Sequence, residues 1–130
     1  MEKMGADIRE LYEAAVKVRE YSYSPYSHFA VGAAVRTAGG RIFSGCNIEN
    51  SSYGISCCAE RNAIFAAVGS GCRDIEAICV TADTPEPVSP CGACRQVMAE
   101  FRIGKIIMAN MKGDFRICTL EEVLPFGFEL

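Results

Sequence analysis

Residues 58–81, CAERNAIFAAVGSGCRDIEAICVT, decide the fold, because two different apolar patterns follow each other without a linker. Cys58–Val68 is rich in alanine and larger apolar residues and has a glycine after it, which predicts a buried helix with a glycine stop. Ile75–Thr81 is a short apolar run with β-branched residues, which is typical of a central strand. The same order returns downstream, with a predicted helix at Cys91–Phe101 and a predicted strand at Lys105–Ala109.

The segments on either side complete a sheet that is covered on both faces. An N-terminal helix is predicted because apolar residues recur at helical spacing, and two antiparallel strands joined by a glycine turn follow it. A strand pair followed by alternating helices and strands predicts an α/β fold, a three-layer α/β/α sandwich with a mixed five-stranded sheet. These further elements are a helix at Ile8–Tyr21, strands at Phe29–Thr37, Arg41–Asn47 and Phe115–Cys118, and a helical turn at Leu120–Leu124.

Length, charge and composition limit the classes of function. The 130 residues suit one domain, spanning residues 1–130, and half of them are apolar. The net charge of -3 argues against a nucleic-acid partner, since such proteins normally carry a basic stripe. No apolar run is long enough to span a bilayer and the charged N-terminal segment is unlike a signal peptide, so we expect no membrane association and a cytoplasmic location. In that reducing compartment the eight cysteines favour metal binding over disulfides.

Two short segments carry a metal-binding pattern, Cys58-Ala-Glu60 and Pro90-Cys-Gly-Ala-Cys94. Each lies at the predicted start of a helix, where unpaired backbone N–H groups and a partial positive charge stabilise a thiolate. A Cys-x-x-Cys turn lets two sulfurs converge on one ion, and the sulfur of Cys58 would be a third ligand. Three protein ligands leave one tetrahedral position open, which is the pattern of a catalytic zinc rather than a structural one.

Glu60 is the candidate acid and base at this centre. It follows Cys58 by two residues, an offset that points two side chains of a regular helix to nearly opposite sides. The two residues can therefore share a site only if Cys58 lies at the extreme first turn of the helix. A carboxylate beside the open zinc position can take a proton from water and return it to a leaving amine.

These segments resemble the zinc nucleoside and nucleobase deaminases, with Cys58 standing where their signature often has histidine. The resemblance extends from about Tyr21 to Phe126, and over this length the chain is similar to the small cytidine deaminase family. The segment Asn47-Ile-Glu49 narrows it further to enzymes of free nucleosides. The four stretches that carry the resemblance are Tyr23–Phe29, Gly45–Asn50, Cys58–Arg61 and Ser89–Val97.

The resemblance implies a fold, a cofactor and an activity. The fold would be cytidine deaminase-like, with Zn²⁺ held by Cys58, Cys91 and Cys94. The activity would be hydrolytic deamination of cytidine and 2'-deoxycytidine to uridine and 2'-deoxyuridine plus ammonia, in pyrimidine salvage. A zinc-activated hydroxide would attack the pyrimidine, with Glu60 as the proton shuttle.

The resemblance also implies how substrate is held and how subunits assemble. Members of this family with short chains form homotetramers with shared active sites. Asn47 and Glu49 match the residues that hold the ribose hydroxyls, and Phe29 matches the ring that lies against the pyrimidine. Phe126 matches a C-terminal phenylalanine that enters the neighbouring subunit's site, a role that Phe128 could take instead. The implied substrate-binding set is Phe29, Asn47, Glu49, Ala59 and Phe126.

The charge of a three-cysteine centre needs compensation. Three thiolates and one Zn²⁺ carry a formal excess of one negative charge, which opposes ionisation of a bound water. Arg61 follows Glu60, and Arg95 follows the last cysteine of the motif. Our hypothesis is that one or both arginines hydrogen-bond to ligand sulfurs and withdraw charge from them.

Other interpretations of these residues stay open at this point. Cys57 could complete a four-thiolate structural site, which would leave Glu60 without a task. Asn47 could be a turn residue, Glu49 a solvated charge, and Phe29 or Phe126 an ordinary core or interface aromatic. Alternative functions are deamination of a cytosine nucleoside antibiotic, polynucleotide editing, and a non-catalytic zinc module. The remaining cysteines, which are expected to be small buried hydrophobes, are Cys46, Cys57, Cys72, Cys79 and Cys118.

Overall fold

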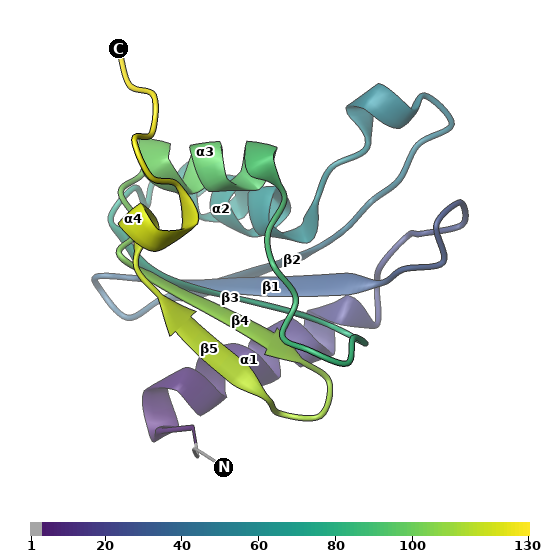
Figure 1. Cartoon of the computed structure of the whole chain (residues 1–130), viewed down its shortest axis with the longest axis horizontal. Helices are drawn as coiled ribbons and strands as arrows, with labels where there is room; N and C mark the ends of the chain where they lie inside the picture. Colours follow the sequence, from purple (N-terminus) through teal and green to yellow (C-terminus); the bar gives the residue numbers. More distant parts are fainter. Residues whose placement is uncertain (1–3) are drawn as a thin grey trace.

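The computed structural model describes residues 4–130, in which five strands form one sheet in the order β2-β1-β3-β4-β5. Helix α1 covers one face of this sheet, and α2, α3 and α4 lie on the other (Figure 1). The elements are α1 (Ala6–Arg19), β1 (Val31–Thr37), β2 (Ile42–Cys46), a 3₁₀ turn η1 (Tyr53–Ile55), α2 (Ala59–Gly69), β3 (Ile75–Ala82), α3 (Gly92–Glu100), β4 (Lys105–Asn110), β5 (Phe115–Cys118) and α4 (Leu120–Val123).

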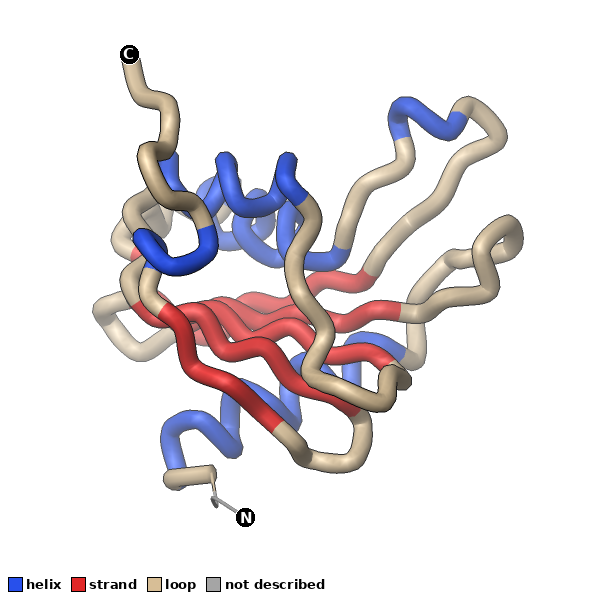
Figure 2. Tube along the Cα trace, in the orientation of Figure 1, coloured by secondary structure: helices blue, strands red, loops and turns tan. Residues whose placement is uncertain are grey.

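The sheet is mixed, as the sequence predicts. Strand β1 pairs antiparallel with both β2 and β3, and β5 pairs antiparallel with β4. Only the β3–β4 pair is parallel within the described chain, with Ile78 opposite Ile106, and α3 forms the crossover between these strands. Figure 2 shows the strands as a central layer between helices, which confirms the three-layer α/β/α prediction.

Each strand supplies alternate side chains to two cores. Val35, Ile78 and Ile106 point to the side of α2 and α3, where they pack with Ile64 and Met98. The intervening residues point to α1 and form a smaller core, which comprises Ile8, Leu11, Ala15, Ala34, Ala77, Cys79, Ile107 and Ala109. This alternation follows from the two-residue period of a strand.

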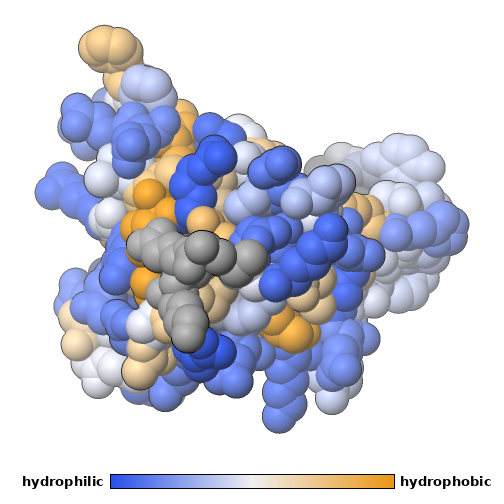
Figure 3. Space-filling view, turned by 60° about the horizontal axis from the view of Figure 1, so that its bottom comes forward, coloured by the Kyte–Doolittle hydropathy of each residue, from blue (hydrophilic) through white to orange (hydrophobic). Residues whose placement is uncertain are grey.

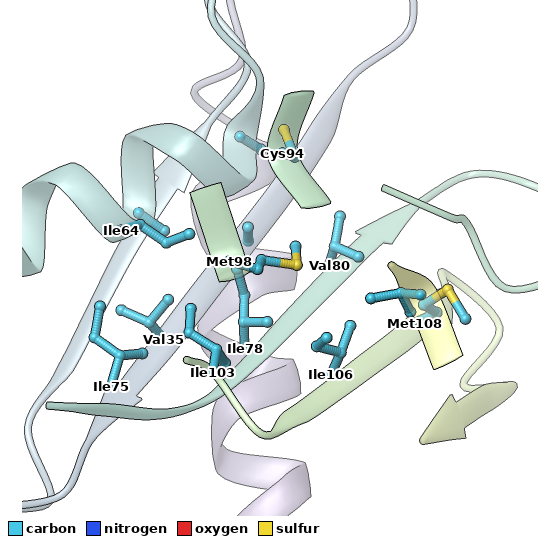
Figure 4. Packing of buried hydrophobic residues seen from close by; sticks show 14 of the residues in the cluster. Val35, Ile64, Ile75, Ile78, Val80, Cys94, Met98, Ile103, Ile106 and Met108 are labelled. Carbon is cyan, nitrogen blue, oxygen red and sulfur yellow. The ribbon is translucent and has the colours of Figure 1, made fainter. Parts of the chain in front are cut away.

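The larger core fixes the helix that carries the Cys-x-x-Cys motif. Cys94 and Met98 are fully buried on the face of α3 that meets the sheet. Figure 4 shows Cys94 next to Val80 and Met98 at the edge of this core. A side chain that packs against a dense core has little freedom to move, so the position of this cysteine is set by the fold.

The start of β1 and the loop after β2 differ from the sequence prediction for local reasons. The predicted strand Phe29–Thr37 begins at Val31, because the Asn47 side chain takes the place of a ladder partner beside Phe29. Its Nδ2 donates to the Phe29 carbonyl (2.7 Å) and its Oδ1 accepts from Val31 N (2.9 Å). The polar loop after β2 contains the 3₁₀ turn η1, which no periodic pattern of apolar residues predicts.

The outer surface of α1 is polar. Its exposed residues include Asp7, Arg9, Glu10, Glu13 and Lys17. Figure 3, with this side of the molecule turned forward, shows mainly hydrophilic side chains and smaller apolar areas. Among the helices of residues 4–130, none combines the length and the apolar character needed to cross a membrane.

Candidate metal centre and active site

The cysteines of the two motifs lie at two helix N-termini. Cys58 is the N-cap of α2 and Cys91 is the N-cap of α3, each with an extended backbone. Cys94 lies in the first turn of α3. The requirement that Cys58 sit at the extreme start of its helix is therefore met. Both N-termini direct a partial positive charge toward the sulfurs, which favours thiolates.

The three sulfurs converge at distances that suit one metal ion. Cys58 Sγ lies 3.6 Å from Cys91 Sγ, which lies 3.4 Å from Cys94 Sγ. Tetrahedral Zn–S bonds of about 2.3 Å place neighbouring sulfurs roughly 3.8 Å apart, so the cluster needs only small shifts to hold zinc. Within residues 4–130 the group of possible ligands is Cys58, Cys91 and Cys94, and Cys57 is outside it.

The electrostatics of the thiols also suit a cation. The Cys94 thiol and the Arg61 guanidinium hold the pKa of Cys58 well below its usual range, at about 5. Arg61 Nη2 donates to Cys58 Sγ at 3.2 Å, while the buried Arg61 Nε has no hydrogen-bond partner in the described chain. A buried guanidinium that is only partly satisfied favours negative charge beside it. The donor set therefore fits Zn²⁺ bound by thiolates.

Glu60 is buried in the first turn of α2, two residues after Cys58. Its side chain is 4% exposed, and burial raises the pKa of its carboxyl group to about 7. The nearby Cys58 sulfur adds to the rise, and Arg61 opposes it. A carboxyl group with a pKa near neutrality can both accept and return a proton, as an acid–base catalyst must.

Arg95 does not contact the sulfurs in the way that Arg61 does. Its Nε donates to the Pro90 carbonyl (2.9 Å) and its Nη1 to the Val123 carbonyl (2.9 Å). The hypothesis of direct contact with the ligand sulfurs thus applies to Arg61. The guanidinium of Arg95 is occupied by two backbone carbonyls instead.

Glu49 and Asn47 lie near the site but have internal hydrogen bonds. The Glu49 carboxylate accepts from Tyr26 N (3.0 Å), Ser27 N (3.1 Å) and the Ser27 hydroxyl. The Ser27 hydroxyl, with the two backbone amides, lowers the pKa of Glu49 below its ordinary value. Asn47 holds the start of β1 as described above and accepts a hydrogen bond from Ser22 Oγ.

A pocket beside Glu49 lies between the loop that contains Tyr26 and the loop that contains Tyr53. It is lined by Tyr26, Ser27, Glu49, Tyr53 and Ser56 and has a volume of about 310 Å³. Sequence reasoning missed Ser27 as the partner of Glu49, although the repeated serines of the Tyr21–Ser27 stretch are typical of residues that hydrogen-bond within loops.

The remaining predicted substrate residues occupy different environments. Phe29 is 41% exposed, next to the loop of Glu49, and Ala59 is fully buried in the first turn of α2. Phe126 and Phe128 lie in the C-terminal segment and are both exposed. Phe126 is the freer of the two, since the Phe128 carbonyl accepts a hydrogen bond from Gln96 Nε2 (2.9 Å). The structure does not bring either phenylalanine to this chain's own sulfur cluster.

The fold and the site together define a class of protein. A three-layer sandwich that presents three thiols at two helix N-termini, with a buried carboxyl group beside them, is that of a zinc-dependent hydrolytic deaminase. Residues 6–110 match the family described as the cytidine and deoxycytidylate deaminase zinc-binding region. The chain belongs to this family of zinc-dependent enzymes.

Individual relatives agree with the family match. The cytidine deaminase of Sporosarcina psychrophila is 50% identical over 124 residues, which cover 94% of this chain and 91% of the relative. The crystal structure of cytidine deaminase from Burkholderia pseudomallei superposes with a TM-score of 0.90 at 45% identity, covering 96% of this chain and all of that one. Blasticidin-S deaminase of Bacillus cereus is more distant, at 33% identity over 92% of this chain and 90% of the relative.

Proposed function

We propose that this chain hydrolyses free cytidine and 2'-deoxycytidine to uridine and 2'-deoxyuridine plus ammonia, as a cytoplasmic enzyme of pyrimidine salvage. The activity belongs to one domain, residues 1–130, working in a homotetramer. The observation that carries the proposal is the buried Glu60 beside three converging thiols, in a chain whose cytidine deaminase relatives match nearly end to end. Neither a nucleic acid nor a membrane is part of this reaction.

The residues of the chain divide the chemistry between them. Cys58, Cys91 and Cys94 would hold zinc, which when bound supplies Lewis-acid activation of water. Glu60 takes up the proton that this water loses and delivers it to ring N3, which makes C4 electrophilic. After the water oxygen has added to C4, Glu60 takes up the second proton from the new C4 hydroxyl group and delivers it to the amine. The C4–N bond then breaks, ammonia leaves and a C4 carbonyl remains. Arg61 donates to Cys58 Sγ (3.2 Å) and offsets the negative charge that three thiolates bring.

Substrate is held by the loops beside this centre. We assign Glu49 and Asn47 to the ribose hydroxyls, Phe29 to the face of the pyrimidine, and the first turn of α2 at Ala59 to the edge of the ring. A charged Glu49 disfavours a phosphate nearby, which supports a nucleoside over a nucleotide. We assign Phe126 to the site of a neighbouring subunit, in keeping with its full exposure.

One second candidate is supported by a specific relative. A blasticidin-S deaminase shares 33% identity with this chain over most of its length. The same centre could therefore act on a cytosine nucleoside antibiotic, with the loops that contain Glu49 and Phe29 setting the preference. Comparison of the two substrates decides between these candidates.

An ultraviolet assay tests the main proposal. Zinc-loaded protein should convert cytidine and 2'-deoxycytidine, and should act far more slowly on deoxycytidylate, cytosine or blasticidin S. Glu60→Gln should lose most of the activity, by at least 10³-fold on the scale of acid–base catalysis, while keeping one zinc per chain. The matched control is Glu13→Gln, on the exposed face of α1, which should behave as the wild type.

Two outcomes would reject the proposal. Wild-type protein with full zinc loading and no turnover of any cytosine nucleoside would exclude it. Full activity of Glu60→Gln would exclude the proton-transfer role. Faster turnover of blasticidin S than of cytidine would favour the second candidate.

A further inference from the structure

Arg95 links two segments that are far apart in the sequence. Its Nε donates to the carbonyl of Pro90, the peptide that leads directly into Cys91. Its Nη1 donates to the carbonyl of Val123, the last residue of α4. The side chain is half-buried, and both hydrogen bonds measure 2.9 Å. One planar guanidinium therefore connects the loop before a metal-binding cysteine to the start of the C-terminal segment.

The next residue of α3 makes a second contact with the same segment. Gln96 Nε2 donates to the Phe128 carbonyl at 2.9 Å. The carbonyls of Val123 and Phe128 flank Phe126 on its two sides, and Phe126 itself is fully exposed. The segment after α4 passes α3 and projects away from the body of the molecule (Figure 1). Residues 95 and 96 thus hold the stretch that presents Phe126 outward.

We propose that Arg95 is a positioning residue that couples the metal loop to the C-terminal segment, with Gln96 as the second anchor of that segment. The inference rests on the proposed function, because it gives Phe126 a task in a neighbouring site. The coupling has a physical basis in the shape of the side chain. Arginine presents its N–H donors on separate nitrogens of a rigid fork, whereas lysine keeps the charge but carries its three donors on one nitrogen, which cannot reach the two carbonyls that Arg95 Nε and Nη1 reach separately.

The two ends of Arg95 have separable consequences. Loss of the Pro90 contact frees the peptide before Cys91, so zinc should leave faster. Loss of the Val123 contact frees the segment that presents Phe126, so the KM for cytidine should rise. The Gln96 side chain donates to the Phe128 carbonyl of the C-terminal segment and makes no hydrogen bond to the metal loop in residues 4–130, so its removal should affect KM alone.

Three variants of the holoenzyme test this division. In Arg95→Lys we expect zinc release to a chromogenic chelator to be about tenfold faster, and KM to rise about fivefold. Gln96→Ala should raise KM by a similar factor with zinc release unchanged. Arg116→Lys on β5 is the matched control, because Arg116 is exposed and belongs to neither the metal loop nor the C-terminal segment, and neither quantity should change.

A double-mutant cycle with Phe126→Ala separates coupling from general loosening. If Arg95 acts on substrate binding through the C-terminal segment, Arg95→Lys should raise KM very little when Phe126 is already absent. Its effect on zinc release should persist undiminished in that background. A structural defect alone would raise KM by the same factor in both backgrounds.

The outcomes are distinct from those that test the function. Wild-type zinc release by Arg95→Lys, or additive KM effects with Phe126→Ala, would overturn the positioning role even in a fully active enzyme. Zinc release is measured without turnover, so the metal-loop half can be judged if cytidine proves not to be a substrate. Should Arg95→Lys fail to fold, as judged by circular dichroism, the cycle of Gln96→Ala with Phe126→Ala tests the C-terminal half by the same criterion.

Discussion

At Gly45 in β2 the backbone of α2 approaches the sheet so closely that a Cβ has no room, and we predict that Gly45→Ala displaces this helix. A Cβ at residue 45 would lie 2.5 Å from Ala63 N, and 2.7 Å and 2.8 Å from the carbonyl carbon and Cβ of Asn62. Two of these atoms belong to the backbone of α2, so no side chain can rotate out of the way. Because α2 begins at Cys58 and carries Glu60, a shift of the helix also moves the site.

The magnitude follows from the contacts. Overpacking costs typically 1–3 kcal/mol, and three contacts below 3.0 Å place this substitution near the upper end, about 3 kcal/mol. An unfolding entropy of about 2.1 cal/mol/K per residue gives roughly 0.27 kcal/mol/K for 130 residues. The expected fall in Tm is therefore about 11 °C. A shift of α2 by about 1 Å should also lower kcat/KM by one to two orders of magnitude.

Thermal unfolding of zinc-loaded protein, at one fixed concentration, measures the first quantity, and the cytidine assay measures the second. The matched control is Gly39→Ala in the turn after β1, where the added Cβ would lie no closer than 3.9 Å to Thr37 Oγ1. This control should lie within about 2 °C of the wild type, as surface substitutions usually do. A Tm for Gly45→Ala equal to that of Gly39→Ala would refute the argument from close approach.

Three further predictions concern separate parts of the molecule. The Ser27 hydroxyl is the main cause of the lowered pKa of Glu49, so Ser27→Ala should move the acid-side rise in KM to higher pH. The sign follows because the proposed ribose contact uses the ionised carboxylate, which is lost as the pH falls through its pKa. Identical pH profiles of KM would contradict this prediction. Removal of zinc by a chelator should lower Tm by at least 10 °C, because an ion present at 1,000 times its Kd stabilises the folded state by about 4 kcal/mol. An unchanged Tm would argue against a native metal site. The Thr119 hydroxyl accepts a hydrogen bond from Glu122 N (3.2 Å) in a capping box, so Thr119→Ala should lower the free energy of unfolding in urea by about 1 kcal/mol. The control Glu121→Ala keeps the cap. Equal losses of stability in the two variants would show that the cap has no role.

The architecture was predictable because it follows from regular periods. The short apolar run of Ile75–Thr81 and the helical spacing in Ile8–Tyr21 are properties of the chain alone, and the observed β3 and α1 coincide with them to within two residues. Helix starts at the cysteines followed from the motif itself. The 3₁₀ turn at Tyr53–Ile55 has no such period, because three residues are too few to express one.

The sequence predicts those parts of the site whose function depends on the type of side chain. The Cys-x-x-Cys spacing of Cys91 and Cys94, with a third cysteine and a glutamate in Cys58-Ala-Glu60, predicts a metal centre. Arg95 shows the limit of this reasoning. Its acceptors are backbone carbonyls of Pro90 and Val123, and every residue has a carbonyl, so no sequence pattern marks these partners. The same limit applies to Asn47, which holds the Phe29 carbonyl.

The placement of Glu60 explains how one helix can serve both the core and the proposed reaction. The buried positions of α2 after its first residue are Glu60, Ala63, Ile64 and Ala67, at the spacing of a single helical face. Glu60 therefore occupies a position of the apolar stripe, where an ionised carboxylate is costly and its pKa rises. Cys58 lies outside the regular helix, because it is an N-cap with an extended backbone. Its sulfur can therefore approach a carboxylate that is only two residues away in the sequence. Moving Cys58 one residue into the helix would separate the two groups, since the fold brings them together only across this boundary.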